Sequence, residues 1–350
     1  MKAYTYILIA VLFLLSSCDI EDFKKELPMD HFDSTPRLVI AAALENNEFD
    51  LYLNRSYPIS PQKVELRGVV NGEVSLYEAD VLIYNEYIVN EWESYTSLQF
   101  YCPNISITPG KSYRIEVSSE GFNPVKSTVI APDYPQIGKI NLNTNPNDRI
   151  KPSKIWNSYA PYTEYCYPLT VELTDISNER NYYSLEPLIY NPNGEYYYPL
   201  ALATTDKILI QDNPAVEAEN ILTDPDYNTY AFSKMLISDL TFRNKTIDLS
   251  LMLGEDSWFQ YGSSTKPPER PGYYIDSIEI QFSVKSISPD IFEYYRAFKL
   301  QNVDDDDFLH FFGEPAIIRS NIEDGYGYFA VNTQASKTIM KLYRQSYWYH

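Results

Sequence analysis

Apolar and polar residues alternate in several stretches of this 350-residue chain with a period of two rather than 3.6. That period is the spacing of a β-strand with one buried face. The clearest examples are Glu48–Leu53, Tyr113–Val117 and Ile278–Lys285, and Arg37–Leu44 is a short apolar run that fits a buried strand. The pattern therefore predicts a chain built mainly from short strands.

One segment near the C-terminal end predicts a helix instead. Ser288 suits an N-cap, Pro289 suits the first helical position, and Asp290 lies where a negative charge complements the helix dipole. The apolar residues that follow, at spacings of three and four, form one face: Ile291, Tyr294, Tyr295 and Phe298. We expect this helix to pack on a sheet and to end near Asn302.

The strands fall into two blocks, as the length of the chain suggests. Six or seven short strands in residues 36–132 are typical of an immunoglobulin-like β-sandwich. Pro132, Pro135 and the polar run Asn141–Asp148 mark the seam between the blocks. We predict an all-β protein, with this sandwich followed by a larger β-rich domain with one short helix in residues 133–350.

The first residues of the chain have a different character. Ile7–Leu15 is an apolar run of nine residues, about 14 Å long as a helix and too short to span a bilayer. It fits the central region of a secretory signal. It leads into Leu15-Ser16-Ser17-Cys18, which resembles the lipobox of bacterial lipoproteins. We expect a lipoprotein signal peptide in residues 1–17 and a diacylglycerol on Cys18, the alternative being a plain secretory signal.

Residues 18–35 are charged and lack hydrophobic periodicity, so we expect a flexible, lipidated tether. Its acidic start, Asp19-Ile20-Glu21-Asp22, resembles the surface-export signal of Bacteroidota-type lipoproteins. That resemblance implies an outer-membrane protein that faces the cell exterior. The alternative is a solvated tether that carries no export signal, in which case a periplasmic orientation remains an alternative.

The charge balance narrows the classes of partner. Acidic residues number 48 and basic residues 28, for a formal net charge of −20. Nucleic-acid surfaces need clustered Lys and Arg, so we expect no nucleic-acid partner. Glycine is scarce, at 12 residues, which leaves little material for glycine-rich phosphate loops.

Candidate catalytic residues are few. Of three histidines, His31 lies on the tether and His350 is terminal, so His310 alone is a candidate general base. The chain has no G-x-S-x-G turn to present a serine nucleophile. We therefore expect no catalytic residue and no cofactor, with His310 in a loop or an interface. Chance carboxylate pairs among the 48 acids keep a hydrolase as an alternative.

The acidic run at residues 304–307 supplies weak metal candidates in Asp304 and Asp306. Calcium sites take oxygen ligands, but the EF-hand loop spaces its acids at alternate positions and needs a Gly and a Glu further on. Consecutive acids point in different directions. The run therefore favours a solvated turn over a metal site.

Cys102 and Cys166 are the thiols that remain beside Cys18. An exported chain permits a disulfide, which would join the two blocks. Two separate buried thiols explain the sequence equally well, and both interpretations stay open here.

Tyrosine is the most unusual feature of the composition, with 33 residues. Preference for half-buried strand positions explains most of them. A flat ring with a hydroxyl also suits stacking on sugars and protein interfaces. The turn at Asn191–Gly194 leads into Tyr196, Tyr197 and Tyr198, which together with Trp258 are the candidate ligand-binding residues.

Several stretches, in one order along the chain, resemble a Bacteroidota outer-membrane lipoprotein family of unknown function that is often encoded beside TonB-dependent receptors. The likeness is carried by Leu51–Ser56, Pro109–Val117, Ser238–Phe242, Ile287–Tyr295 and Ser320–Phe329. One departure is Phe311-Phe312-Gly313, where the family has Asn-Pro-Phe. The resemblance implies a location at the outer membrane, and it brings no catalytic residue.

We therefore expect a non-enzymatic lipoprotein of the outer membrane, accessory to a TonB-dependent transporter or binding a nutrient. A surface hydrolase acting on a polymer and a structural envelope protein are the alternatives.

Overall fold

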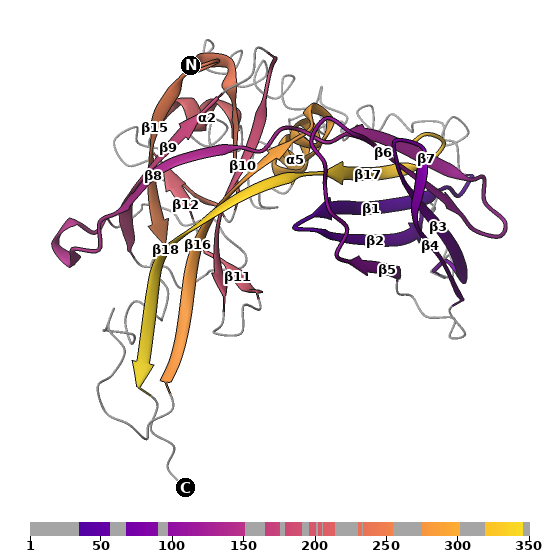
Figure 1. Cartoon of the computed structure of the whole chain (residues 1–350), viewed down its shortest axis with the longest axis horizontal. Coiled ribbons are helices and arrows are strands. Elements are labelled where there is room, and N and C mark those ends of the chain that lie inside the picture. Colours follow the sequence, from indigo (N-terminus) through magenta and orange to yellow (C-terminus); the bar gives the residue numbers. More distant parts are fainter. Residues whose placement is uncertain are drawn as a thin grey trace, which may run out of the picture. The chain divides into compact units, whose positions relative to one another are not determined.

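β-strands make up most of the part of the chain that the computed structural model describes, which confirms the predicted all-β class (Figure 1). The described residues are 35–56, 68–89, 97–150, 165–175, 179–190, 196–200, 202–204, 206–213, 230–232, 234–254, 275–301 and 319–345. Among them, no helix is long and apolar enough to cross a membrane.

The first seven strands and β17 form two facing four-stranded sheets around one hydrophobic core. One sheet has the order β17-β1-β2-β5 and the other the order β4-β3-β6-β7. This is the strand arrangement of an immunoglobulin-like sandwich, with one added strand. The bounds are β1 Leu38–Glu45, β2 Glu48–Arg55, β3 Asn71–Glu78, β4 Val81–Val89, β5 Leu98–Pro103, β6 Ser112–Ser118, β7 Val125–Ile130 and β17 Tyr326–Val331.

The period of two in the sequence appears directly as burial. Every second residue of β1 is buried, beginning with Leu38, and β6 alternates in the same way from Tyr113. Asn46 and Asn47 join β1 to β2 with φ values of 52° and 62°. Two consecutive positive φ values match a type I′ hairpin turn, a conformation that Asn tolerates well.

Tyr113 fixes the loop that precedes β6. Its ring is fully buried, and its hydroxyl oxygen accepts a hydrogen bond from the Thr108 backbone N–H at 2.9 Å. The same hydroxyl lies 3.4 Å from the Ser106 carbonyl oxygen and 3.2 Å from a Glu78 carboxylate oxygen. A tyrosine that bonds back to the backbone a few residues upstream is the tyrosine corner of immunoglobulin-like domains.

The added strand β17 comes from near the end of the chain and pairs in parallel with β1, from Val39 opposite Tyr326 to Leu44 opposite Val331 (Figure 1). Residues 133–350 thus contribute a strand to a sheet of residues 36–132. The strands of both ranges belong to one compact unit of the chain. The domain bounds expected from the sequence, residues 36–132 and 133–350, stay predictions.

The second block forms two further sheets around a second core. One has the order β11-β10-β16-β18, with β14 also paired to β10, and the other the order β13-β12-β15-β9-β8. The predicted strand at Ile278–Lys285 lies within β16. The bounds are β8 Gln136–Leu142, β9 Cys166–Thr174, β10 Tyr182–Tyr190, β11 Tyr196–Pro199, β12 Leu202–Thr204, β13 Tyr230–Phe232, β14 Met235–Ser238, β15 Thr246–Gly254, β16 Ile275–Ile287 and β18 Thr333–Gln345.

The predicted helix is confirmed as α5, Pro289–Gln301. The Ile291 N–H donates to the Ser288 hydroxyl at 3.4 Å, as an N-cap requires. Ile291 and Phe292 are buried against Tyr182, Leu236 and Ala330, while the side chain of Phe298 lies outside the described residues. A second helix, α2 at Lys207–Asp212, corrects the expectation of one helix. Six residues are too few to show a helical period.

Candidate functional site

Five of the residues singled out in the sequence lie outside the described part of the chain. They are Cys18, Trp258, Asp304, Asp306 and His310. Tyr196, Tyr197 and Tyr198 belong to β11, whose backbone pairs with the end of β10, but their side chains are not described. The described residues therefore do not include the predicted ligand-binding side chains, and these assignments stay predictions.

The two internal cysteines are not joined to each other. Cys102 is half-buried on β5, and burial raises the pKa of its thiol. Cys166 is buried at the start of β9. Of the two interpretations of these residues, the structure shows separate thiols.

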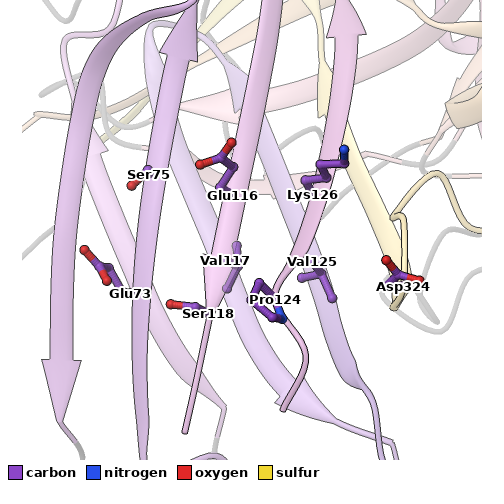
Figure 2. Close-up of a pocket in the computed structure, with 9 residues that line it drawn as sticks. All are labelled: Glu73, Ser75, Glu116, Val117, Ser118, Pro124, Val125, Lys126 and Asp324. Atoms are coloured by element: carbon purple, nitrogen blue, oxygen red, sulfur yellow. The ribbon is translucent and has the colours of Figure 1, made fainter.

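A surface hollow of about 420 Å³ lies on the sheet formed by β4, β3, β6 and β7 (Figure 2). Strand β3 contributes the side chains of Glu73 and Ser75, and β6 contributes Glu116 and Ser118. Asp324, from the segment before β17, closes the side beyond β7 (Figure 2). The remaining lining residues are Val117, Pro124, Val125 and Lys126.

Strand register explains why these polar side chains share one face. Ser75 lies opposite Asn85 on β4 and opposite Glu116 on β6, and Glu116 lies opposite Lys126 on β7. Lys126 also bridges to Glu323. These five residues form a polar row across the sheet. Directly opposite residues point to the same face, so the row is set by register and not by any local motif.

Each residue of the row takes part in a hydrogen bond or an ion pair. The Asn85 amide donates to the Ser75 hydroxyl at 2.9 Å and to Glu73 at 3.3 Å. The Lys126 ammonium lies 3.2 Å from the Glu323 carboxylate, and Arg114 forms a close ion pair with Glu116.

The hollow is acidic, since three carboxylates and one ammonium line it. Such a surface favours cationic groups, and the hydroxyls of Ser75 and Ser118 offer further hydrogen bonds. Among the described residues, no group of three or more His, Cys, Asp or Glu side chains has the geometry to hold a metal ion.

The segment Ser320–Phe329 positions Asp324 at this hollow. Asn321 donates to the Phe329 carbonyl at 2.8 Å and accepts from the Phe329 N–H at 2.9 Å, which closes the segment into a loop. A Cβ on Gly325 would lie 2.9 Å from the Leu38 carbonyl oxygen, and one on Gly327 would collide with the Ile40 carbonyl. Glycine is therefore needed where this loop approaches β1.

A second polar cluster lies inside the unit. The Lys285 ammonium is 3.0 Å from Glu186 and 3.1 Å from Glu45, and the Lys234 ammonium is 3.1 Å from Glu186. Asn332 donates to Glu45 at 3.0 Å, and Ser184 donates to Glu186 at 2.9 Å. We call the four charged residues the Lys285 network. Two positive and two negative groups balance its charge.

The pKa values of this network keep all four groups charged at neutral pH. Burial alone raises the pKa of Glu186, but Lys234 and Lys285 together lower it to about 2. Burial also raises the pKa of Glu45, which Lys285 brings below its ordinary value. Conversely, burial lowers the pKa of Lys285, and Glu186 and Glu45 raise it above its ordinary value.

The network connects strands from both sandwiches instead of opening to a cavity. Glu45 ends β1, Glu186 lies on β10 and Lys285 lies on β16. Lys234 also lies 4.2 Å from the centre of the Tyr295 ring, within cation–π distance. Because every charge is matched, the arrangement serves to position strands. Its sequence signal was weak, since Glu45 and Glu186 are the single charges of β1 and β10.

Comparisons with known proteins place the chain in a family. Residues 20–338 match the family described as Domain of unknown function (DUF4249). A search of curated proteins finds no match. Among solved structures, the crystal structure of the chicken CNTN1 FN1-FN3 domains is similar at 10% identity with a TM-score of 0.20. That match covers 70% of this chain, and the chain spans 59% of that structure.

Proposed function

We propose that this chain, which belongs to the family DUF4249, is a lipid-anchored binding protein of the bacterial outer membrane. Diacylglycerol on Cys18 holds the chain at the membrane, and the acids that follow direct it to the cell exterior. The single observation that carries this proposal is the apolar run Ile7–Leu15 leading into Leu15-Ser16-Ser17-Cys18. Several acyl chains, at about 0.8 kcal/mol for each buried methylene, anchor a protein stably.

The proposed role is accessory to a TonB-dependent transporter. The resemblance of the chain to lipoproteins encoded beside such receptors supports this role, and the acidic hollow supplies a place for contact. A partner segment that carries Lys or Arg fits a hollow lined by Glu73, Glu116 and Asp324. Exposed charges of this kind contribute more to orientation and partner choice than to affinity.

Affinity capture from native membranes tests the role. Wild-type protein is compared with the double variant Glu73→Gln/Asp324→Asn, which removes two carboxylates from the hollow. Asp248→Asn/Asp290→Asn is the matched control, because both residues are exposed acids outside the hollow. We expect the hollow variant to recover about fivefold less transporter, as the loss of about 1 kcal/mol of exposed ion pairing implies.

The two results that contradict the role are distinct. If the hollow variant and the control recover equal amounts of the transporter, the hollow is not the site of contact. Recovery of no transporter by the wild-type chain removes the accessory role itself, and a thermal shift with a nutrient ligand would then favour nutrient binding.

A further inference from the structure

Strand β1 is the first described strand after the tether predicted for residues 18–35. It lies inside its sheet, between β2 and β17 (Figure 1). With acyl chains on Cys18, a force that separates the protein from the membrane reaches β1 at its first residue, Leu38. The tether delays this force, since residues 18–35 span at most about 60 Å when fully extended. Beyond that distance, β1 carries it.

The parallel pairing of β1 with β17 decides how the sheet opposes such a force. The force enters β1 at its start, and the chain leaves β17 at its end, Val331, toward β18. Because the strands are parallel, these two points lie at opposite ends of the pair. The hydrogen bonds of a sheet run from strand to strand. A force between opposite ends therefore slides the strands and loads these bonds together, whereas a force between adjacent ends breaks them one at a time.

The residue before β1 is held by both neighbouring strands. The Arg37 N–H donates to the Ser56 hydroxyl at 2.9 Å, and the Ser56 N–H donates to the Arg37 carbonyl at 2.8 Å. Ser56 directly follows β2. On the other side, the Arg37 guanidinium lies 5.6 Å from the centre of the Tyr326 ring of β17, within cation–π distance. The point at which the force enters the sheet is therefore fixed to β2 and to β17.

The far end of β1 is bound to strands of the second block. The Glu45 carboxylate lies 3.1 Å from the Lys285 ammonium of β16. Asn332, between β17 and β18, donates its backbone N–H to the Leu44 carbonyl at 3.0 Å and its amide to Glu45 at 3.0 Å. Strand β18 pairs in turn with β16. A force on β1 therefore passes to the second block both through β17 and through Glu45.

A slip of β1 along its neighbours also disturbs the core. The side chains of Leu38, Ile40, Ala42 and Leu44 are at most 1% exposed. Successive residues of a strand point to opposite faces, so a slip of one residue moves all four out of the core. The same slip breaks the antiparallel pairing with β2, which extends over the whole of β1. Burial thus adds to the hydrogen bonds in opposing the force.

We propose that β1 is a load-bearing strand, which β2, β17 and the contacts of Glu45 hold in place against force from the lipid anchor. The inference rests on the proposed anchor for the source of the force, while the resistance is a property of the fold. Resistance to force depends on the rate of unfolding and not on the equilibrium free energy. It is therefore measured as a rate under load, in two directions of pulling.

Single-molecule force spectroscopy compares the two directions. The chain 18–350 with Cys18→Ser, which carries no lipid, has one handle before residue 18 and a second handle at exposed Ser336 or at exposed Asp324. Ser336 lies beyond the end of β17, so this handle loads β1 and β17 at opposite ends. Asp324 precedes β17, so that handle loads them at adjacent ends. At one constant force, we expect the first unfolding step to be at least about tenfold slower with the handle at Ser336, as loading one or two more hydrogen bonds at the barrier implies.

The variant Glu45→Gln separates load bearing from a general loss of stability. It removes the charge that pairs with Lys285 at the far end of β1. With the handle at Ser336 this end carries load from the start, whereas with the handle at Asp324 it carries load only after the near end has separated. We expect the variant to unfold about fivefold faster with the handle at Ser336 and at an unchanged rate with the handle at Asp324.

Glu279→Gln is the matched control. Glu279 also pairs with a lysine across neighbouring strands, since its carboxylate lies 2.8 Å from the Lys341 ammonium. That pair joins β16 to β18 and lies outside β1. We expect this substitution to leave the unfolding rate unchanged with either handle.

Two results overturn the proposal. One is an equal rate of unfolding with the handle at Ser336 and at Asp324, and the other is an effect of Glu45→Gln that is the same with both handles. Failure of the anchor is a separate result, because these rates are measured without lipid. Cys18→Ala protein that stays in the membrane fraction would remove the proposed source of the force and leave the measured rates as they are.

Discussion

The buried hydroxyl of Tyr113 joins β6 to the loop before it. It accepts from the Thr108 N–H and lies within hydrogen-bonding distance of Ser106 and Glu78. We predict that Tyr113→Phe lowers the free energy of unfolding by about 1–2 kcal/mol, because a backbone donor loses its acceptor. Urea denaturation measures the loss. Tyr87→Phe, at an exposed ring, should change stability little, and equal effects would contradict the role given to Tyr113.

Gly327 allows β17 to lie beside β1. Its φ is +103°, and a Cβ there would collide with the Ile40 carbonyl. We predict that Gly327→Ala costs more than about 3 kcal/mol, as a backbone clash within a sheet implies. Gly110 also has a positive φ, of +74°, but open space surrounds it. Gly110→Ala should therefore cost only about 1–2 kcal/mol. Equal losses in thermal denaturation would show that the contact with β1 is unimportant.

Single residues also show where sequence reasoning succeeds. Ser288 and Pro289 predict the start of α5 because capping acts within a few residues. The role of Gly327 was not predictable, because it depends on Ile40, which is distant in sequence. The resemblance located the segment Ser320–Phe329, but only the structure shows that its glycines serve close packing.

Strands β1, β10 and β16 meet through the Lys285 network. Lys285 and Glu186 have side chains only 8% exposed. We predict that Lys285→Met costs about 3–5 kcal/mol, because it removes the buried ammonium that Glu45 and Glu186 share and leaves Lys234 beside Glu186 alone. Lys126→Met is the matched control, since it breaks an exposed pair with Glu323 and should cost less than about 1 kcal/mol. Chemical denaturation of the two variants compares them, and similar losses would refute a positioning role for the network.

Glu186 makes the stability of the chain depend on pH. The pKa of this carboxyl is about 2 when folded, against an ordinary value of 4.5. The unfolded chain therefore takes up the proton first as the pH falls. The stabilisation is complete above pH about 5 and is lost as the pH falls toward about 2, amounting to about 3 kcal/mol.

We predict that Glu186→Gln removes this part of the acid dependence. The variant is less stable than wild type at pH 7, and its free energy of unfolding falls less steeply between pH about 5 and about 2. Denaturant titrations at a series of pH values measure the slope. Parallel slopes for variant and wild type would contradict the low pKa of Glu186.

Strands in which apolar and polar residues alternate clearly were predictable from the sequence. Strands that are buried on both faces were not, because they lack this alternation. The alternation of Ile278–Lys285 identified β16 correctly. In β10, however, residues 182–189 are all buried, Glu186 included, so no alternation marks the core face. Sequence patterning assigns charges to solvent, and it therefore missed the Lys285 network.

At the scale of the whole molecule, the features that the sequence missed depend on contacts between distant residues. Asn332 bonds to Glu45 across 287 positions of the chain, and β17 joins a sheet that begins at β1. The acidic hollow likewise depends on the registers of β3, β6 and β7. The pattern of apolar and polar residues along the chain carries no information about such long-range pairings. The all-β class, in contrast, follows from the alternation within each strand alone.

The central claim is that acyl chains on Cys18 hold the chain at the outer membrane, and fractionation of cell envelopes tests it most directly. We predict that wild-type protein sediments with outer membranes and is released by detergent, while Cys18→Ala is recovered in the soluble fraction. Cys102→Ala, which removes an internal thiol, should sediment like wild type. Cys18→Ala protein that remains in the washed outer-membrane pellet as completely as wild type would contradict the account.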